Sequence, residues 1–177
     1  MSRRFVLIDR DGTINEERHY LSLPEQLALL PGVAAGLKSL QGLGLGLAVV
    51  TNQSGIGRGY FDQAALERVH QRLIALLRAE GVTLDGIYSC PHGPDEDCDC
   101  RKPRPGMIAQ AAREHGFDPA QAFVIGDKGV DMDLGRAVGA VTLLVRTGYG
   151  RRWEGKAAAD YVVDDLEAAA KVIAGLV

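Results

Sequence analysis

Two carboxylates, Asp9 and Asp11, stand two positions apart near the start of the chain, in the sequence DRDGT. They follow the apolar segment Phe5–Ile8, so both could face one site where the chain leaves a buried strand. One carboxylate of such a pair can attack a substrate or bind a metal ion while the other moves protons. An aspartate nucleophile suits phosphoryl transfer, because the acyl phosphate that it forms is easily hydrolysed. A simple strand-ending turn is the alternative interpretation.

Other apolar segments are followed by side chains that such chemistry needs. Asp127, after Ala122–Ile125, is a further acid for Mg²⁺, which binds one or two carboxylates and completes its octahedron with waters and phosphate oxygens. The hydroxyl of Thr51 and the amide of Asn52 could hold phosphoryl oxygens, and Lys102 could neutralise negative charge that develops in the transition state. Each of these features also has an ordinary interpretation when it is taken singly. Asp127 could cap a helix, Thr51 and Asn52 could form a common turn, and Lys102 could be a solvated surface lysine.

A cluster of sulfur and imidazole ligands lies in one short segment, at Cys90, His92, Cys98 and Cys100. Three thiolates and one imidazole satisfy the tetrahedral preference of structural zinc and leave no open position for catalysis. An odd number of clustered cysteines also favours a metal over disulfides in a reducing compartment. A metal-free loop is the alternative, which the acids, glycine and prolines of the segment disfavour. Zinc would stiffen a loop that runs directly into Lys102.

Short apolar runs alternate with helical patterns along the chain. Strands are expected at Phe5–Ile8, Leu45–Val50, Gly86–Ser89, Ala122–Ile125, Val141–Val145 and Tyr161–Val163. Helices are expected around Val33–Leu40, over Leu66–Leu77 with Asp62 as N-cap, from Pro105 in a first turn, at Val130–Ala137 and at Leu166–Ile173. This alternation predicts a parallel sheet covered by helices, whose ligands bind at the carboxyl ends of the strands. On the helices, His70 is expected at the surface and His115 near a helix end.

The length and composition of the chain limit the number of domains and the classes of binding partner that can be expected. The chain has 177 residues, 46% of them hydrophobic, and a formal net charge of -3. We expect a single domain over residues 1–177 with an ordinary core. The apolar runs are far shorter than the ~20 residues that span a bilayer, and the N-terminal run is too short for a signal peptide. A slightly acidic chain also disfavours nucleic acid. We therefore expect a cytoplasmic monomer without membrane or nucleic-acid partners.

The order of these motifs resembles that of the haloacid dehalogenase (HAD) superfamily of phosphatases. The matching positions are Asp9-x-Asp11-Gly12-Thr13, Thr51-Asn52, Lys102 and Gly126-Asp127 followed by Asp131. The resemblance implies a three-layer, Rossmann-like α/β fold with a parallel sheet, in which Asp9 is the nucleophile and Asp11 the acid and base. It also implies that Mg²⁺ is held by the Asp9 and Asp127 carboxylates and the Asp11 carbonyl. By the same resemblance, Thr51 and Lys102 hold phosphoryl oxygens, and Asp131 orients Lys102.

A narrower resemblance covers nearly the whole chain. The motifs above, together with the run from Thr51 through Arg58 to Phe61, the zinc loop and Lys128, resemble the heptose-1,7-bisphosphate 7-phosphatase family. It implies removal of the C7 phosphate of D-glycero-D-manno-heptose 1,7-bisphosphate, on the route to nucleotide-activated heptose for bacterial surface glycans such as lipopolysaccharide. The substrate contacts that it implies are Glu17, Arg18, His19, Tyr20, Asn52, Gln53, Ser54, Arg101 and Lys128. The expected elements leave no room for a cap domain, so short loops should select the substrate.

Two other functions stay open at this point. The short gap between His92 and Cys98 also resembles the phosphatase part of histidinol-phosphate phosphatase. A zinc-stabilised binding module without catalysis is the alternative from another class, and the intact pair Asp9 and Asp11 counts against it. Phosphatases that process nucleic-acid ends use a similar acid pair, but this chain has few aromatic residues and no basic stripe to bind a strand.

Overall fold

A six-stranded parallel sheet forms the centre of the protein, whose computed structural model describes residues 2–177. The strands are β1 (Phe5–Ile8), β2 (Gly46–Asn52), β3 (Gly86–Cys90), β4 (Phe123–Gly126), β5 (Val141–Val145) and β6 (Tyr161–Val163). Their order across the sheet is β3-β2-β1-β4-β5-β6, and every neighbouring pair is parallel. The predicted strands are confirmed, with shifts of one or two residues at the ends of β2, β3 and β4.

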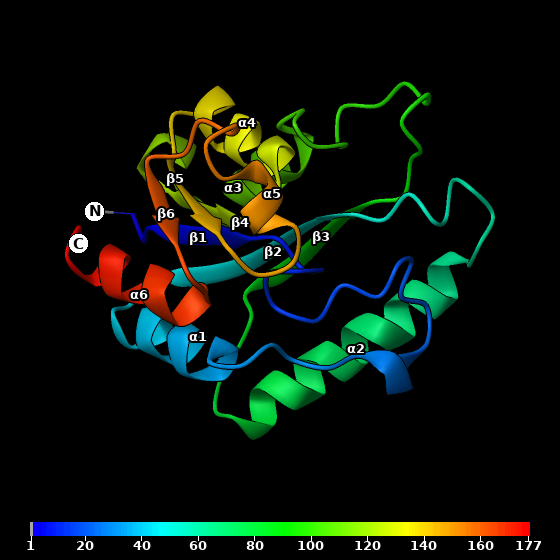
Figure 1. Cartoon of the computed structure of the whole chain (residues 1–177), viewed down its shortest axis with the longest axis horizontal. Helices are drawn as coiled ribbons and strands as arrows, with labels where there is room; N and C mark the ends of the chain where they lie inside the picture. Colours follow the sequence, from blue (N-terminus) through cyan, green and yellow to red (C-terminus); the bar gives the residue numbers. More distant parts are fainter. Residues whose placement is uncertain (1) are drawn as a thin grey trace.

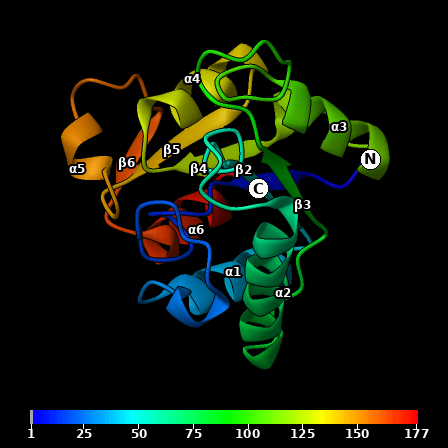
Figure 2. The same ribbon diagram turned by 90° about the vertical axis from the view of Figure 1, so that its right-hand side faces the viewer.

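Helices cover both faces of this sheet (Figures 1 and 2). On one face lie α1 (Val33–Gly42), α2 (Gln63–Ala79) and α6 (Leu166–Ala174). On the other lie α3 (Gly106–His115) and α4 (Gly129–Ala137), and the short α5 (Gly150–Trp153) follows β5. The predicted three-layer α/β fold is therefore confirmed. Within residues 2–177, no helix combines the length and apolar character that a membrane crossing requires.

Strand β1 shows why the strands of this sheet have continuously apolar sequences. Its side chains alternate between two cores, and all four of its residues are buried. Val6 and Ile8 pack in the core beneath α1, α2 and α6, whereas Phe5 and Leu7 pack in the core beneath α3 and α4. A strand covered on both faces buries successive side chains, so it lacks the polar alternation of a half-exposed strand.

The helix ends follow local chemistry. Asp62 accepts a hydrogen bond from the backbone of Ala65 and caps α2, as expected. Pro105 occupies the N-cap position, so α3 begins one residue later than a proline in its first turn would imply. His115 is the last residue of α3, as expected, and Gly116 closes the helix with φ of 68°.

The strand order places one edge of the sheet in a special position. The order in which strands are added reverses at β1, because β2 and β3 lie on one side of it and β4, β5 and β6 on the other. Ligands of open α/β sheets bind at the carboxyl ends of the strands beside such a switch point. Asp9 and Asp127 follow β1 and β4 directly, and Thr51 and Asn52 end β2. Among the described residues, the segments before β2 and before Lys102 hold only a 3₁₀ turn, α1, α2, β3 and loops, with no separate cap domain.

Candidate active site

Lys102 connects two aspartates at the carboxyl edge of the sheet. Its Nζ donates to Asp9 Oδ1 over 2.8 Å, to Asp131 Oδ1 over 2.7 Å and to the carbonyl of Val50 over 3.0 Å. These contacts use all three ammonium protons of a lysine that is 4% exposed. Burial alone would lower the pKa of Lys102, but Asp131 and Asp9 outweigh it and raise the pKa above its usual value. The lysine therefore stays charged beside Asp9.

The backbone around Lys102 is held by the end of β2. Asn52 Oδ1 accepts from the Lys102 amide over 2.9 Å, and Asn52 Nδ2 donates to the Lys102 carbonyl over 3.4 Å. Thr51 is buried, and its hydroxyl accepts from Gln53 Nε2 over 2.9 Å. The structure thus places Thr51 in a supporting hydrogen-bond network, outside the residues that line the cavities described below.

Three acidic side chains crowd together next to this lysine. Carboxylate oxygens of Asp9, Asp127 and Asp131 all lie within 4.8 Å of one another, and all three residues are buried. Asp127 Oδ2 accepts from the Tyr149 amide over 2.9 Å, whereas Asp127 Oδ1 is buried without any hydrogen-bond partner among the described residues. Burial, then repulsion from Asp9 and Asp131, raises the pKa of Asp127 to about 9. Burial and Asp9 raise the pKa of Asp131 to about 6.

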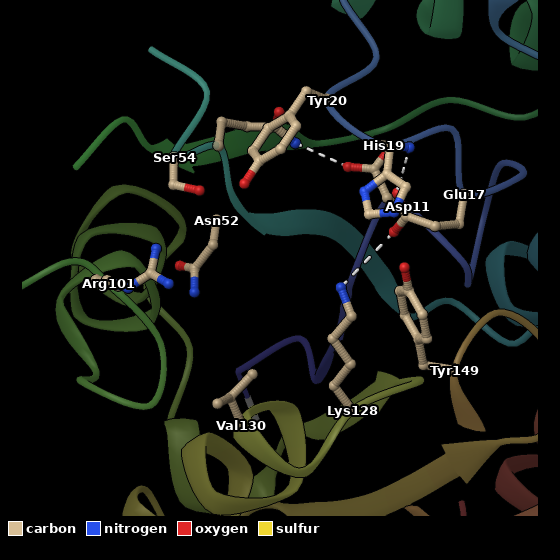
Figure 3. A pocket seen from close by; sticks show the side chains of 11 residues that line it. Asp11, Glu17, His19, Tyr20, Asn52, Ser54, Arg101, Lys128, Val130 and Tyr149 are labelled. Atoms are coloured by element: carbon tan, nitrogen blue, oxygen red, sulfur yellow. Dashed lines mark hydrogen bonds and ion pairs between the residues drawn. The ribbon is translucent and has the colours of Figure 1, made fainter. Parts of the chain in front are cut away.

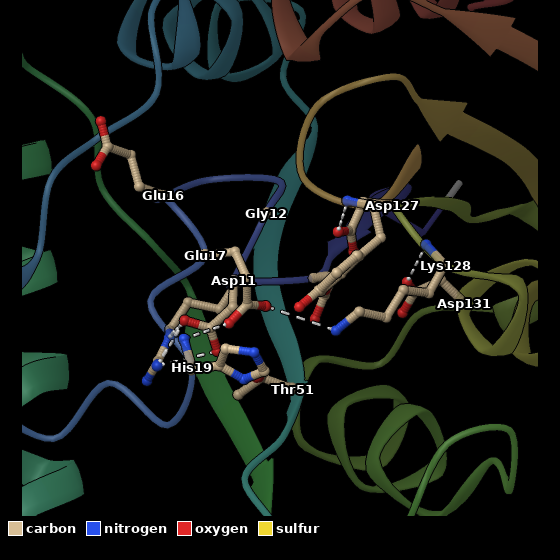
Figure 4. A network of polar contacts seen from close by, with 12 residues as sticks. Asp11, Gly12, Glu16, Glu17, His19, Thr51, Asp127, Lys128 and Asp131 are labelled. Carbon is tan, nitrogen blue, oxygen red and sulfur yellow. Dashed lines mark hydrogen bonds and ion pairs between the residues drawn. The ribbon is translucent and has the colours of Figure 1, made fainter. Parts of the chain in front are cut away.

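Three clustered carboxylates, one of which has an oxygen without a hydrogen-bond partner, provide the oxygen ligands that a small cation such as Mg²⁺ prefers. Two glycines, Gly12 and Gly148, leave space beside Asp127, and Figure 4 shows Gly12 and Asp127 in this network. Gly12 has φ of 83°, and a side chain there or at Gly148 would collide with Asp127 Oδ2. Of the predicted magnesium residues, Asp9 and Asp127 therefore fit the ion by residue type, burial and available space, whereas the part of the Asp11 carbonyl stays a prediction.

Asp11 is held by a separate set of donors. Arg10 Nη2 donates to both carboxylate oxygens of Asp11, over 2.8 Å and 3.0 Å, and Arg10 Nε donates to Oδ1 over 3.2 Å. Asn15 and Gln53 add one hydrogen bond each, over 3.0 Å and 2.9 Å. Burial would raise the pKa of Asp11, but the Arg10 charge and these hydrogen bonds outweigh it and lower the pKa. Asp11 is thus an ionised, oriented carboxylate.

A cavity of about 330 Å³ opens in front of these groups (Figure 3). A smaller one of about 50 Å³, which borders Asp9 and Lys102, shares several of its lining residues. All the predicted substrate contacts except Arg18 line the larger cavity, together with Asp11, Val130 and Tyr149. The full lining is Asp11, Glu17, His19, Tyr20, Asn52, Gln53, Ser54, Arg101, Lys128, Val130 and Tyr149. Arg18 instead pairs with Glu16 over 2.7 Å on the surface.

The cavity carries cations besides Lys102. Lys128 Nζ lies 3.7 Å from Glu17 and 5.0 Å from the centroid of the Tyr149 ring. Burial acts against its charge, but Asp9, Asp127 and Glu17 together raise the pKa of Lys128. Arg101 Nη1 donates to the carbonyl of His92 over 3.2 Å, so this second cation is tied to the cysteine loop. The larger cavity is therefore lined by two cations, Arg101 and Lys128, in addition to the buried lysine that borders the smaller one.

The four predicted zinc ligands converge. Their ligand atoms lie within 4.8 Å of one another, and His92 Nδ1 is 3.4 Å from the Cys90 sulfur and 3.3 Å from the Cys100 sulfur. Cys90, Cys98 and Cys100 are all free thiols. Three thiols and one imidazole at this spacing fit a tetrahedral zinc ion. Such an ion would hold the loop that carries Arg101.

The sequence-based prediction for His70 is wrong. His70, expected on the helix surface, is 6% exposed and accepts a hydrogen bond from Arg10 Nη1 over 3.1 Å. The apolar stripe of α2 carried the signal, because position 70 lies four residues after Leu66 and three before Leu73, on the buried face. Tyr149 could have been found from its place after β5, because the carboxyl end of every strand in a parallel sheet is a candidate ligand position.

Comparisons with known proteins agree with this geometry. A family model described as HAD-hydrolase-like matches residues 99–169. D-glycero-beta-D-manno-heptose-1,7-bisphosphate 7-phosphatase of Pseudomonas aeruginosa is 40% identical over 176 residues, which cover 98% of this chain and 99% of the relative. Its counterpart of Helicobacter pylori is 44% identical over 135 residues, which cover 76% of this chain and 78% of the relative.

A solved structure shares the whole fold. D,D-heptose 1,7-bisphosphate phosphatase from B. bronchiseptica, complexed with magnesium and phosphate, superimposes with a TM-score of 0.91 and 33% sequence identity. The match covers 98% of this chain and 99% of that chain. The sequence identity, the shared fold and the acid-lysine cluster lead to one conclusion: the chain is a HAD phosphatase and belongs to the D-glycero-beta-D-manno-heptose-1,7-bisphosphate 7-phosphatase family.

Proposed function

We propose that this phosphatase hydrolyses the C7 phosphate of D-glycero-beta-D-manno-heptose 1,7-bisphosphate with Mg²⁺ bound, in the synthesis of nucleotide-activated heptose. The observation that carries the proposal is the buried pair formed by Asp9 and Lys102, which lies beside Asp127 and borders a small cavity that Lys128 also lines. The names of the two curated relatives specify the β anomer and supply the proposed substrate and its anomer.

In the first half of the proposed reaction, a carboxylate oxygen of Asp9 attacks phosphorus at C7. The bond between phosphorus and the C7 oxygen breaks as the bond to Asp9 forms, and Asp11 gives its proton to the leaving oxygen. Asp11 is ionised in the absence of substrate, and the dianionic phosphate raises its pKa by like-charge repulsion, which favours uptake of that proton. Lys102 neutralises charge on the phosphoryl oxygens.

In the second half, a water oxygen attacks the phosphorus of the aspartyl phosphate. Asp11, now ionised, takes a proton from this water, the bond between phosphorus and Asp9 breaks, and inorganic phosphate leaves. Both halves use the same carboxylate as acid and then as base. The donors that orient Asp11, from Arg10, Asn15 and Gln53, therefore act twice in each turnover.

The metal residues have distinct tasks in this proposal. Asp9 and Asp127 would hold Mg²⁺ through their carboxylates, with the backbone carbonyl of Asp11. When bound, the ion supplies positive charge that stabilises the phosphoryl oxygens. Asp131, 2.7 Å from Lys102 Nζ, orients the lysine toward Asp9.

The remaining cavity residues would bind the sugar and its second phosphate. Arg101 and Lys128 are suited to the C1 phosphate, since an arginine fork can bind phosphate bidentately. Polar groups of Glu17, His19 and Ser54 face the same cavity and are suited to the heptose hydroxyls. Thr51 supports Gln53, whose amide reaches Asp11. Arg18, bound to Glu16 at the surface, takes no role in the proposal.

The zinc loop serves positioning in this proposal. A zinc ion on Cys90, His92, Cys98 and Cys100 would fix the His92 carbonyl that accepts from Arg101. Charge that is already in place needs no reorganisation during the reaction, so it stabilises the transition state more than mobile charge does. We further propose that residues 1–177 act as one domain, as a monomer and in the cytoplasm.

The test is a comparison of kcat/KM for the α and β heptose bisphosphates and for histidinol phosphate, with Mg²⁺ and with a chelator. We expect the β anomer to be preferred, activity to require Mg²⁺, and the variant Asp9→Asn to release no phosphate from any of the three. A tenfold preference for histidinol phosphate, equal to ~1.4 kcal/mol in transition-state binding, would reject the substrate. Unchanged phosphate release by Asp9→Asn would reject the mechanism.

A further inference from the structure

A buried chain of three side chains runs from α2 to Asp11. Arg10 is fully buried, and its guanidinium contacts two groups on opposite ends. Nη2 and Nε lie against the Asp11 carboxylate, whereas Nη1 donates to His70 Nε2 over 3.1 Å. Because a guanidinium has donors and no acceptor, the His70 nitrogen must be the acceptor. The His70 imidazole on α2 therefore binds the side of the Arg10 guanidinium that faces away from Asp11.

The imidazole is suited to a permanent acceptor role. Burial, reinforced by the neighbouring Arg10 charge, lowers the pKa of His70 to about 4, although Glu67 and Asp11 act in the other direction. His70 is thus neutral near pH 7, with its proton on Nδ1 and its lone pair on Nε2. His70 also borders a cavity of about 280 Å³ between α2 and β3, which shares no lining residue with the cavity in front of Asp11. The hydrogen-bond route from His70 to Asp11 therefore runs through Arg10.

Fixing both ends of Arg10 matters because the orientation of Asp11 decides whether its proton reaches the leaving oxygen. An arginine side chain has several rotatable bonds, and a guanidinium anchored only by a carboxylate can turn together with it. The His70 contact removes that freedom. A shift of about 1 Å in a group that transfers a proton can cost about 10²-fold in rate.

We propose that His70 is a positioning residue for proton transfer by Asp11, acting through the Arg10 guanidinium. This inference rests on the proposed function for the role of Asp11 itself. It adds a residue that lies 60 positions from Arg10 in the sequence and outside the substrate cavity.

The experiment uses substrates whose leaving groups differ in their need for a proton. The C7 oxygen of the heptose bisphosphate leaves as a poor alkoxide unless Asp11 protonates it, whereas p-nitrophenolate leaves from p-nitrophenyl phosphate without help. The constant kcat/KM reports steps through the first irreversible one, which is formation of the aspartyl phosphate. A defect in the Asp11 proton transfer therefore lowers kcat/KM for the heptose substrate selectively.

Three variants separate the hydrogen bond from the shape of His70. His70→Leu removes the acceptor, His70→Gln places an oxygen near the position of Nε2, and His70→Asn has an amide too short to reach Arg10. Leu77→Ala, in the core on the same helix, is the control for general loosening of α2. Full Mg²⁺-loaded protein is used throughout, and circular dichroism checks the fold.

We expect His70→Leu and His70→Asn to lose about tenfold in kcat/KM for the heptose bisphosphate and less than threefold for p-nitrophenyl phosphate. His70→Gln should stay within about threefold of the unmodified protein for both, and Leu77→Ala should show no selective loss. Equal losses on both substrates, no loss, or equal behaviour of the Gln and Asn variants would each overturn the proposal. If His70→Leu is insoluble, the Gln and Asn pair decides. An unmodified protein inactive on both substrates would instead reject the proposed function.

Discussion

Lys102 Nζ and Asp9 Oδ1 lie 2.8 Å apart, although the two residues are 93 positions apart in the sequence. This ion pair is buried, and Asp131 shares the same lysine from the other side. One cation thus serves two carboxylates, while the third acid of the cluster, Asp127, has no cation of the protein in direct contact among the described residues. Burial, followed by repulsion from Asp9 and Asp131, raises the pKa of Asp127, and a bound cation would offset that repulsion.

Lys102→Met should unfold the protein more easily as well as stop the reaction. Removing one partner of a buried ion pair leaves uncompensated buried charge, which costs about 3–5 kcal/mol. Urea unfolding of the metal-free protein measures this cost, and phosphate release measures activity. Lys171→Met is the matched control, because Lys171 forms only an exposed pair with Glu167 and should change stability by at most about 0.5 kcal/mol. Similar stabilities for the two variants would contradict the buried-pair interpretation.

Gly12→Ala should abolish activity through a collision rather than through backbone strain. Gly12 has φ of 83°, and an added Cβ would strike Asp127 Oδ2. Gly44 has φ of 78° but open space around its Cβ position, so Gly44→Ala carries the strain of about 1 kcal/mol without the collision. We expect at least about 10²-fold loss of kcat and weaker Mg²⁺ binding in Gly12→Ala, and neither in Gly44→Ala. Calorimetric Mg²⁺ titration and phosphate release check this.

Stability of the metal-free protein should fall as the pH rises from about 5 to 9. The pKa of Asp127 is raised to about 9 and that of Asp131 to about 6 in the folded state, so the folded protein binds protons that the unfolded chain has released. Stability from these groups is complete at low pH and is lost as the pH passes the raised pKa values. Thermal unfolding in chelator measures it, and Asp127→Asn should flatten the dependence. A variant curve parallel to that of the unmodified protein would refute this cause.

Magnesium should reverse that trend. Metal binding needs the ionised carboxylates and releases their protons, so Mg²⁺ should raise the thermal midpoint more at pH 8 than at pH 6. The same unfolding experiment with and without Mg²⁺ tests this. A larger shift at the lower pH would argue against the cluster of Asp9 and Asp127 as the binding site.

Purified protein should contain one zinc ion per chain, and Cys98→Ser should lose it. Without the ion, the loop that holds Arg101 through the His92 carbonyl is free to move. We expect KM for the bisphosphate to rise about tenfold with a smaller change in kcat, because Arg101 is proposed to bind the phosphate that does not react. Elemental analysis and steady-state kinetics measure both effects. A variant without zinc whose KM is unchanged would remove the positioning role from the loop.

Much of the fold could be predicted because each strand carries its own signal. Phe5–Ile8 and Val141–Val145 are short apolar runs bounded by polar residues, and strands buried on both faces must have that pattern. The ends of the elements were predicted less accurately. Strand β2 continues to Asn52 because its backbone pairs with Ser89 and Cys90, which local composition does not show.

The chemical groups could be found because the chemistry restricts their types and the sheet restricts their place. Asp9, Asp127 and Asn52 each follow or end a strand of the central sheet, where the rule for parallel sheets puts ligands. The partners of these groups could not be found in this way. From the local sequence alone, a polar side chain such as that of Arg10 or His70 is predicted to be exposed. Its burial becomes favourable only with a hydrogen-bond partner that is distant in the sequence.

The sequence by itself thus determined the class of sheet and indicated the acids and lysine of the proposed site and the four residues of the cysteine cluster, because local patterns and residue chemistry specify these. Only the tertiary structure decided which donors hold Asp11, which carboxylate is left without a cation, and that His70 faces the interior. Those features depend on distances between residues far apart in the chain. They exist only once the strands have been placed side by side.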